Sequence, residues 1–387
     1  MKQIATAFIL LISTLSFAQK ATSPIIFKLQ GHSEDLQCMA MSGNGKFIAS
    51  GSWDGMFNIF KTDTNYTPNG SYLDHISAVN AIAITSTGKF IATGSIDGTV
   101  ITYKSDSFGN FTRDKNLPIH RLAVNSLYID GTGKYVYTGS NDGTISFYDI
   151  PKLKDKRITN GSPVTSIAVT NDRRNIFCSD NTSIIKKYDL EGKVIKTLEG
   201  HTDQVNHIIL TKDNKYLISA SSDKTIRIWN VQTNKLERTL TGHDWKVVTL
   251  AVSFNNKYIV SGSNDGSIKV WDFETGAVIK SIDGVGTKVR GVGISNDLSR
   301  VFAAMHYDLD SFESAGILVF KSGIEIVKKE PPKVPGKPGS PAKTPQAKTP
   351  ATGNSTDPSK QIIKKTPEIE ISEDKKKTPE PKTNGER

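Results

Sequence analysis

Five segments of the chain carry a histidine, a hydroxyl residue and an aspartate at constant spacing, the residue types of a nucleophilic catalytic triad. In each segment the histidine precedes the aspartate by 22 residues, the hydroxyl residue precedes it by four, and an aromatic residue follows it by six. The sets are His32, Ser50, Asp54 and Phe60; His75, Thr93, Asp97 and Tyr103; His120, Thr138, Asp142 and Tyr148; His201, Ser219, Asp223 and Trp229; His243, Ser261, Asp265 and Trp271. Five copies of one triad in one chain make sense as architecture and little sense as catalysis, so we interpret them as structural clamps.

Each clamp is expected to join two loops on one edge of a small sheet, the histidine from one loop and the aspartate from the next. Shielded charge-assisted hydrogen bonds of this kind contribute about 1.5 to 3 kcal/mol. The clamps use five of the seven histidines and leave only His207 and His306 for other roles. Phosphate-binding glycine loops, Cys-x-x-Cys pairs and nucleophile-elbow motifs are absent from the sequence. The sequence therefore predicts a protein that is not an enzyme and has no metal or cofactor.

A period of 40 to 45 residues indicates a repeat architecture, and the elements within one period predict its type. Around Asp223, strand-like runs occur at Val205–Leu210, Tyr216–Ser219, Thr225–Trp229 and Lys235–Leu240, with Gly, Asn and Asp at the bends. Four short strands per period are typical of a propeller blade. Two further periods keep the apolar frame without the clamp: one has Asn160 and Thr182 at the His and Asp positions, and the last has Val285 at the His position and extra residues around 307–314. We therefore predict an all-β, seven-bladed propeller.

The dipeptides Gly200-His201 and Gly242-His243, together with Ile228-Trp229 and the run Val270–Asp272, resemble the WD40 repeat family. The resemblance covers residues 24–328 and implies a seven-bladed propeller that acts in protein binding. It also implies that the indole N–H ends a hydrogen-bond relay through the hydroxyl residue and His to Asp. The first three repeats depart from this pattern, because Phe60, Tyr103 and Tyr148 stand where the family has Trp.

Two segments compete to close the ring. Ile25–Leu29 is a strand-like run placed before Gly31-His32, where every other repeat has its fourth strand. We expect this run to form the outer strand of blade seven and remove an exposed edge. The rival is Ile324–Lys328, which follows Phe320 at the spacing of an ordinary fourth strand.

The two ends of the chain differ in composition from the repeats. Residues 1–18 combine Lys2, the uncharged run Ile4–Phe17 and small residues at Ser16 and Ala18, the pattern of a cleaved signal peptide. This predicts an exported protein, periplasmic or secreted, that begins near Gln19 and has no membrane span. Residues 329–387 contain eleven prolines, no aromatic residue and repeated Lys-Thr-Pro, which predicts a disordered basic tail.

Charge argues against a nucleic-acid partner. Half of the net charge of +10 lies in the mixed-charge tail, and no basic face is concentrated in the repeats. A solubilising spacer is the favoured role for the tail, and weak contact with anionic envelope material is the alternative.

A protein-binding face is expected on the edge that carries the clamps, because a rigid disc presents loops there. The residue before each turn aspartate should point outward, and Arg121 and Trp245 should share that edge. The candidate residues are Trp53, Ile96, Arg121, Asn141, Ser222, Trp245 and Asn264.

A second set of mostly polar residues recurs in the first strand of each repeat and is expected to line the central channel. Its members are Gln37, Asn80, Asn125, Thr165, Asn206, Val248 and Arg290. Water or a small polar ligand would occupy the mouth of this channel. The sequence thus favours an exported, non-enzymatic scaffold for protein partners, with a carbohydrate- or small-ligand-binding propeller of the cell envelope as the alternative and a hydrolase as a third reading.

Overall fold

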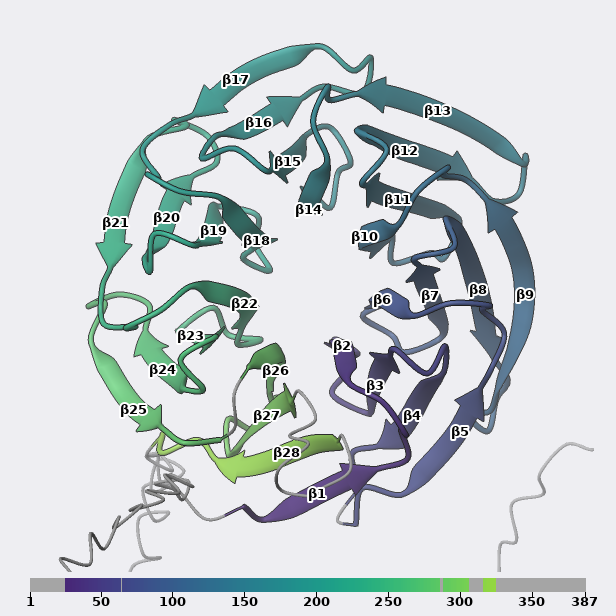
Figure 1. Ribbon diagram of the computed structural model, residues 1–387, viewed down its shortest axis with the longest axis horizontal. Coiled ribbons are helices and arrows are strands. Elements are labelled where there is room, and N and C mark those ends of the chain that lie inside the picture. The colour runs from purple at the N-terminus through teal and green to yellow at the C-terminus, as the bar shows by residue number, and fades with distance from the viewer. Residues whose placement is uncertain (1–24, 64, 286–287, 306–315, 325–387) are drawn as a thin grey trace, which may run out of the picture. The chain divides into compact units, whose positions relative to one another are not determined.

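The computed structural model describes residues 25–63, 65–285, 288–305 and 316–324. Within these ranges the chain forms 28 strands and no helix. The strands form seven four-stranded antiparallel sheets arranged in a ring, with one strand of each sheet next to the central axis and one on the rim (Figure 1). This confirms the predicted all-β, seven-bladed propeller.

Blades one to three follow one another along the chain, and each runs from the axis to the rim. Blade one contains β2 (Leu36–Met41), β3 (Phe47–Ser52), β4 (Phe57–Lys61) and β5 (Pro68–Tyr72). Blade two contains β6 (Val79–Ile84), β7 (Phe90–Ser95), β8 (Thr99–Ser105) and β9 (Phe111–Pro118). Blade three contains β10 (Val124–Ile129), β11 (Tyr135–Ser140), β12 (Thr144–Asp149) and β13 (Lys154–Thr159).

Blades four to six repeat this order. Blade four contains β14 (Val164–Val169), β15 (Ile176–Asp180), β16 (Ile185–Tyr188) and β17 (Val194–Leu198). Blade five contains β18 (Val205–Leu210), β19 (Tyr216–Ser221), β20 (Ile226–Asn230) and β21 (Leu236–Leu240). Blade six contains β22 (Val247–Val252), β23 (Tyr258–Ser263), β24 (Ile268–Asp272) and β25 (Val278–Ile282). The four runs expected around Asp223 therefore match the strands of blade five to within one or two residues at each end.

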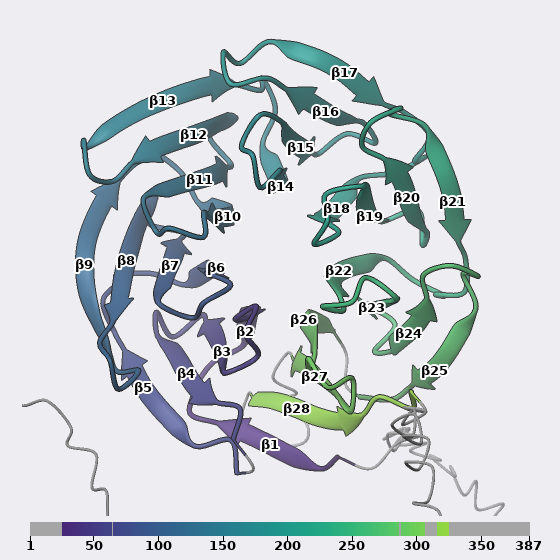
Figure 2. The same ribbon diagram turned by 180° about the vertical axis from the view of Figure 1, so that it is seen from behind.

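Blade seven is built from both ends of the propeller. It contains β26 (Val289–Ile294), β27 (Arg300–Met305), β28 (Gly316–Lys321) and β1 (Phe27–Gln30). Strand β1 pairs antiparallel with β28, with Phe27 opposite Val319 and Gln30 opposite Gly316, so it takes the outermost place in the sheet. The view from behind shows β1 and β28 side by side on the rim (Figure 2). The prediction that residues 25–29 close the ring is thus confirmed.

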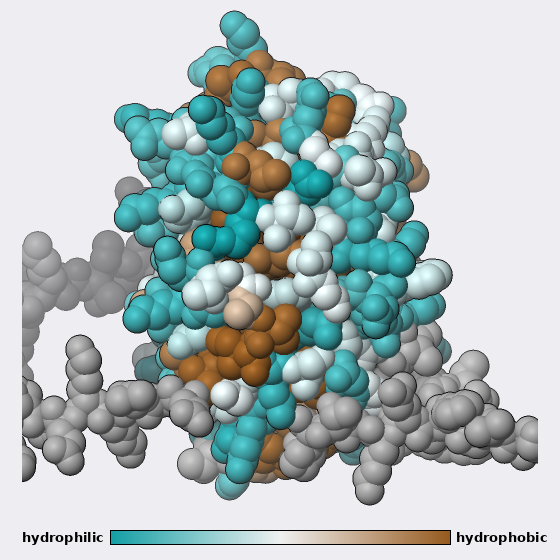
Figure 3. Space-filling view, turned by 90° about the vertical axis from the view of Figure 1, so that its left-hand side faces the viewer, coloured by the Kyte–Doolittle hydropathy of each residue, from teal (hydrophilic) through white to brown (hydrophobic). Residues whose placement is uncertain are grey.

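Burial changes from the axis to the rim because neighbouring blades cover each sheet. Every residue of β3 is buried, whereas most residues of the outer strand β13 are exposed. Apolar side chains of the outer strands of blades four to six remain partly exposed; they are Val194, Ile195, Leu236, Val278 and Ile279. On that side of the molecule the hydrophobic surface is divided into separate groups among polar residues (Figure 3). The hydrophobic core therefore lies between the blades, at the level of the second and third strands.

Close contact between blades requires small residues at a repeated position of the second strand. A Cβ atom placed on Gly51 would lie 2.6 Å from Cγ1 of Val79, which is the first residue of the next blade's innermost strand. The same relation holds between Gly94 and Val124. A glycine three residues before the clamp aspartate therefore lets the following blade pack closely.

Several predictions concern residues outside the described ranges. These are the signal segment 1–18, the extra residues around 307–314 and the tail 329–387. Among the described residues, no helix has the length and apolar character needed to cross a membrane.

Candidate functional site

Blades five and six contain the complete four-residue relay. In blade five, Nδ1 of His201 lies 2.7 Å from Oδ2 of Asp223, and Nε2 lies 2.7 Å from Oγ of Ser219. The indole Nε1 of Trp229 donates to the same Oγ at 2.8 Å. Because an ionised carboxylate can only accept, Nδ1 of the imidazole donates to Asp223, while Nε2 is bonded to the serine hydroxyl. Blade six repeats these contacts with His243, Asp265, Ser261 and Trp271, as the sequence indicates.

Blades one to three bring the same three residue types together without the indole. Nδ1 of His32 lies 3.0 Å from Asp54 and Nδ1 of His120 lies 3.0 Å from Asp142. In blade two, Nδ1 of His75 is 3.4 Å from Asp97 and closer, at 3.0 Å, to Thr99 Oγ1. The hydroxyl groups of Ser50, Thr93 and Thr138 contact the other ring nitrogen at 2.6 to 2.9 Å. The constant spacing therefore produces a constant geometry in all five blades.

The turn aspartate also organises the backbone on both sides of the clamp. In blade three, the N–H groups of Arg121 and Thr144 both donate to the Asp142 carboxylate. Burial alone would raise the pKa of Asp142, but hydrogen bonds from Thr144, Arg121 and His120 outweigh it and lower the pKa to about 2. For His120 burial is the stronger effect and lowers the pKa, and the attraction of the Asp142 carboxylate offsets this only in part. A neutral histidine beside an ionised aspartate is the state that these shifts favour.

This arrangement has little capacity for nucleophilic chemistry. The five clamp histidines are buried, and each of the five serine or threonine residues is at most 1% exposed. In blades five and six the hydroxyl oxygen already accepts an indole N–H. No group of three or more His, Cys, Asp or Glu residues in the described ranges is placed to hold a metal ion. The clamps therefore tie the loop before the first strand to the turn before the third.

Blade four joins the same two loops with different residues. Nδ2 of Asn160, at the histidine position, donates to Asp180 Oδ2 at 3.0 Å. Nζ of Lys186 contacts this oxygen and Asn160 Oδ1 at 3.1 Å each, and the Tyr188 hydroxyl donates to Asn160 Oδ1 at 2.7 Å. The carboxylate of this clamp comes from Asp180, two residues before Thr182, which stands at the aspartate position of the repeat. A blade expected to lack a clamp therefore has one, and the acidic residue two positions upstream was the available signal.

The clamp edge of the propeller, here called the clamp face, displays most of the predicted binding residues. Trp53 is 51% exposed and Trp245 is 54% exposed, and Arg121 and Asn141 are exposed. Lys224 places its ammonium 5.9 Å from the centre of the Trp245 ring.

The expectation that every residue before a turn aspartate points outward is wrong at Ser222. This side chain is 7% exposed, and its hydroxyl group is bonded to the Asn206 amide at 3.2 Å. Ile96 and Asn264 are half-buried. The position lies beside the channel residue of the same blade, so a small polar side chain turns toward that residue and not toward solvent.

Three exposed apolar residues of this face were not predicted. Ile76 is 93% exposed, Leu73 is 67% exposed and Leu122 is 53% exposed. Ile76 directly follows a clamp histidine, and its N–H donates to Asp97. The other residues at this position are Ser33, Arg121, Thr202 and Asp244. An apolar side chain at an otherwise polar repeat position was the signal that could have identified it.

These residues are continuous with the predicted ones across blades one to three. Gly55, two residues after Trp53, lies close to the next blade: a Cβ atom placed on it would contact the Leu73 side chain and the carbonyl of His75. Each turn of one blade thus adjoins the clamp loop of the next. We call the set the apolar arc, and its members are Trp53, Leu73, Ile76, Ile96 and Leu122.

The channel residues link consecutive blades. Nδ2 of Asn125 donates to the carbonyl of Val164 at 2.8 Å, and Thr165 and Asn206 make the same bond to Val205 and Val247. Asn80 contacts Asn125 at 3.3 Å. Four of the seven predicted channel residues therefore hold neighbouring innermost strands together, which leaves fewer polar groups for a ligand.

Comparison with known proteins identifies the repeats. The sequence model of the family described as "WD domain, G-beta repeat" matches residues 23–61, 66–104, 112–149, 192–230 and 234–272, together about half of the chain. The five matches contain the five His–Asp clamps. Each match begins with the outer strand of the preceding blade, and the three inner strands of blades four and seven, which lack the histidine, lie outside the matched residues.

Similarity to curated relatives is confined to one short stretch. The chain is 45% identical over 47 residues to the nuclear distribution protein nudF of Emericella nidulans, and these residues are 12% of this chain and 11% of the relative. The proteins of the same name from Aspergillus terreus and Aspergillus niger are 43% and 45% identical over 47 residues, with 10% and 11% of their length covered. The chain thus spans about a tenth of the length of these relatives.

Proposed function

Since the chain belongs to the WD domain, G-beta repeat family, whose propellers bind protein partners, we propose that it is a non-enzymatic scaffold that binds a protein through its clamp face. The observation that carries this proposal is the apolar arc. Ile76 is almost fully exposed although its backbone is held by a clamp aspartate, so the side chain is presented on a rigid frame. Exposed Trp and Ile side chains on a preorganised surface are the type that supplies interface energy.

Polarity differs between the two halves of this face. Blades five and six surround Trp245 with Asp244, Lys246 and Lys224. Blades one to three instead present the five apolar side chains of the arc, with Asp74 next to Leu73 and Arg121 next to Leu122. We infer that the arc forms the centre of the interface and that the polar half forms its rim.

The experiment is affinity purification of the partner with crosslinking, followed by affinity measurement on variants. Trp53→Ala should weaken binding by about 2 kcal/mol or more, roughly 30-fold, because a tryptophan at an interface centre commonly contributes this much. Ile76→Asp should abolish capture. Phe254→Ala is the matched control, because Phe254 is 61% exposed but follows the end of β22, on the opposite edge of the disc. Unchanged capture by the first two variants would overturn the proposal.

We also propose that the protein is exported, on the basis of the pattern in residues 1–18. Cell fractionation and amino-terminal sequencing test this directly. Protein recovered outside the cytoplasm with its amino terminus near Gln19 would support export. Cytoplasmic protein that retains residues 2–18 would contradict it.

A further inference from the structure

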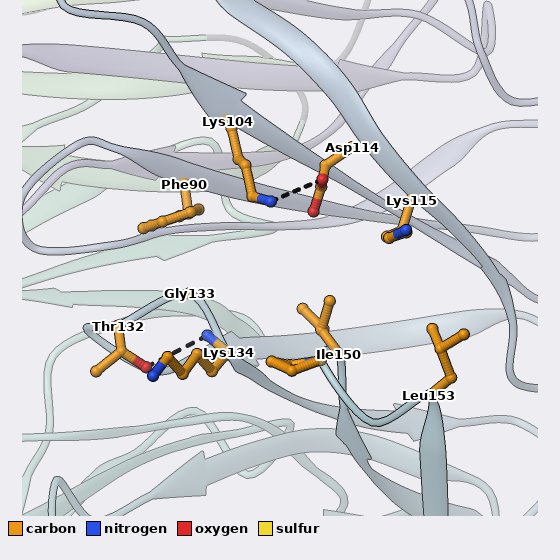
Figure 4. Close-up of a pocket in the computed structure, with 10 residues that line it drawn as sticks. Phe90, Lys104, Asp114, Lys115, Thr132, Gly133, Lys134, Ile150 and Leu153 are labelled. Atoms are coloured by element: carbon orange, nitrogen blue, oxygen red, sulfur yellow. Dashed lines mark hydrogen bonds and ion pairs between the residues drawn. The ribbon is translucent and has the colours of Figure 1, made fainter. Parts of the chain in front are cut away.

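The seam between blades two and three contains an open cavity of about 480 Å³ on the rim of the disc. Figure 4 shows Lys104 and Asp114 on one side of this space and Lys134, Ile150 and Leu153 on the other. The turn that carries Lys134 follows the end of β10, so the cavity lies toward the edge opposite the clamps. It is therefore separate from the clamp face.

The apolar floor of this cavity is formed by Phe90, a half-buried aromatic ring that no second ring covers. The first residue of the second strand is aromatic in several blades, and the next blade covers it. Phe47 packs edge-on against Phe111 at 5.4 Å, and Tyr216 packs against Phe273 at 5.3 Å. Phe90 has the same position in blade two, but no ring or guanidinium group of the described chain packs on it.

Two differences in sequence leave Phe90 open. Ile150 follows the third strand of blade three, where blade six has Phe273. The outer strand of blade three begins with the exposed Lys154, where blade two has the buried Phe111. The turn glycine Gly133 lies against the ring, since a Cβ atom there would overlap it, and Phe90 also packs against the core cluster that contains Ile150. The smaller side chains leave space above Phe90 that Phe111 fills above Phe47 and Phe273 fills above Tyr216.

Positive charge surrounds this apolar floor. Lys104 is paired with Asp114 at 2.8 Å. Lys115 and Lys134 line the same cavity, and neither has an ion pair among the residues that the structure describes. A bulge in β9 explains why Asp114 and Lys115 both face the cavity: Thr102 pairs with Lys115 and Tyr103 with Arg113, which leaves Asp114 between them. The cavity thus presents two unneutralised ammonium groups beside an aromatic ring.

We propose that this seam is a second binding site, for a partner peptide in which acidic residues flank one bulky aliphatic side chain. The aliphatic group fits over Phe90, Ile150 and Leu153, and the carboxylates pair with Lys115 and Lys134. An extended peptide is favoured because β9 is the edge strand of its sheet, so an added strand can pair with it beyond Phe111, whose carbonyl accepts the Tyr72 hydroxyl.

The test uses a fluorescein-labelled peptide with Glu-Ile-Glu in a Gly-Ser background and measures anisotropy with the whole protein. Two matched peptides replace both Glu residues by Gln or the Ile by Ala. We expect saturable binding of the first peptide, weakened by salt, and roughly 10-fold weaker binding of each matched peptide. No binding of the first peptide up to ~1 mM, or equal binding of all three, would overturn the proposal.

Protein variants locate the site. Lys134→Gln and Lys115→Gln should each weaken binding roughly 5-fold, and the double variant more. Lys89→Gln is the matched control, because Lys89 follows the turn glycine Gly88 at the filled seam, where that glycine packs on Phe47. An equal loss in the control variant, or no loss in the double variant, would place the peptide elsewhere. Because the clamp face is not changed, these results are independent of the partner capture described above.

Discussion

Blades five and four make the same connection between loops with different chemistry. Blade five uses an imidazole between a carboxylate and a serine, with an indole N–H at the end of the relay. Blade four uses an amide and an ammonium that both donate to Asp180, with a phenol that donates to the amide oxygen. The comparison teaches that a buried carboxylate in this turn can be paired with a donor from the preceding loop in more than one way, and that histidine is one of them.

The largest effect should come from removing the carboxylate of blade four. Asp180→Ala leaves the Lys186 ammonium and the Asn160 amide without their shared partner, in a place where the Asp180 side chain is 1% exposed. We expect a loss of about 3 to 5 kcal/mol in the free energy of unfolding, measured by urea denaturation. A loss below about 1 kcal/mol would show that blade four does not depend on this network.

The histidine clamps should be somewhat less sensitive. Asp223→Ala or Asp265→Ala removes the acceptor of one buried imidazole N–H, whereas Asp180→Ala removes the partner of both an ammonium and an amide. We expect a loss of about 2 to 4 kcal/mol in the same assay. If these variants lose more stability than Asp180→Ala, the ammonium of blade four is less important than the comparison implies.

The two kinds of clamp should also differ in their response to pH. Burial lowers the pKa of His75 and His120, and lowers that of His207 to about 4. The unfolded chain then binds protons at a higher pH than the folded chain, so stability falls as pH drops below 6.5. The contribution of Asp142 is complete above its ordinary pKa of 3.8 and is lost as pH falls through about 2.

Urea midpoints measured from pH ~7.5 to ~5 test the histidine part of this prediction. His120→Asn should reduce the slope, since asparagine can donate to Asp142 without titrating in this range. Lys186→Gln in blade four should lower the midpoint at every pH and leave the slope unchanged. An equal slope in the wild type and in His120→Asn would contradict the assignment.

The smallest effect is expected at Thr182, the residue of blade four at the aspartate position of the repeat. Its hydroxyl group donates to Asp180 at 2.6 Å, but its backbone N–H donates to the same oxygen at 2.9 Å and remains after substitution. Thr182→Ala should therefore cost well under 1 kcal/mol in urea denaturation. A loss as large as that of Asp223→Ala would show that position in the repeat, and not the relay, determines stability.

The fold was predictable because a repeated spacing is a property of the sequence alone. His201, Ser219 and Asp223 recur at fixed separations, and their hydrogen bonds follow once four strands per period are assigned. Ring closure was predictable for the same reason, since the segment before Gly31 occupies the place of a fourth strand in the repeat.

Features that depend on neighbouring blades were not predictable in this way. Asp180 does not stand at the repeated aspartate position, and its role depends on its contacts with Lys186 and Asn160 in the folded blade. Ser222 turns inward because Asn206 binds it, although the repeat places it with the exposed Trp53. The open seam at Phe90 depends on which side chain of the next blade reaches the ring, and no pattern within one repeat contains that information.

The pairing of β1 with β28 has a consequence for how the chain folds. Phe27 and Val319 are neighbours in one sheet although almost the whole propeller separates them along the chain. Six blades are assembled from contacts between nearby residues, whereas the seventh requires the two ends of the propeller to meet, and such a non-local contact is slow to form. Until then β28 has an open edge that can accept β1 from another molecule. At high protein concentration, refolding should therefore produce some domain-swapped dimers, in which two chains exchange this strand.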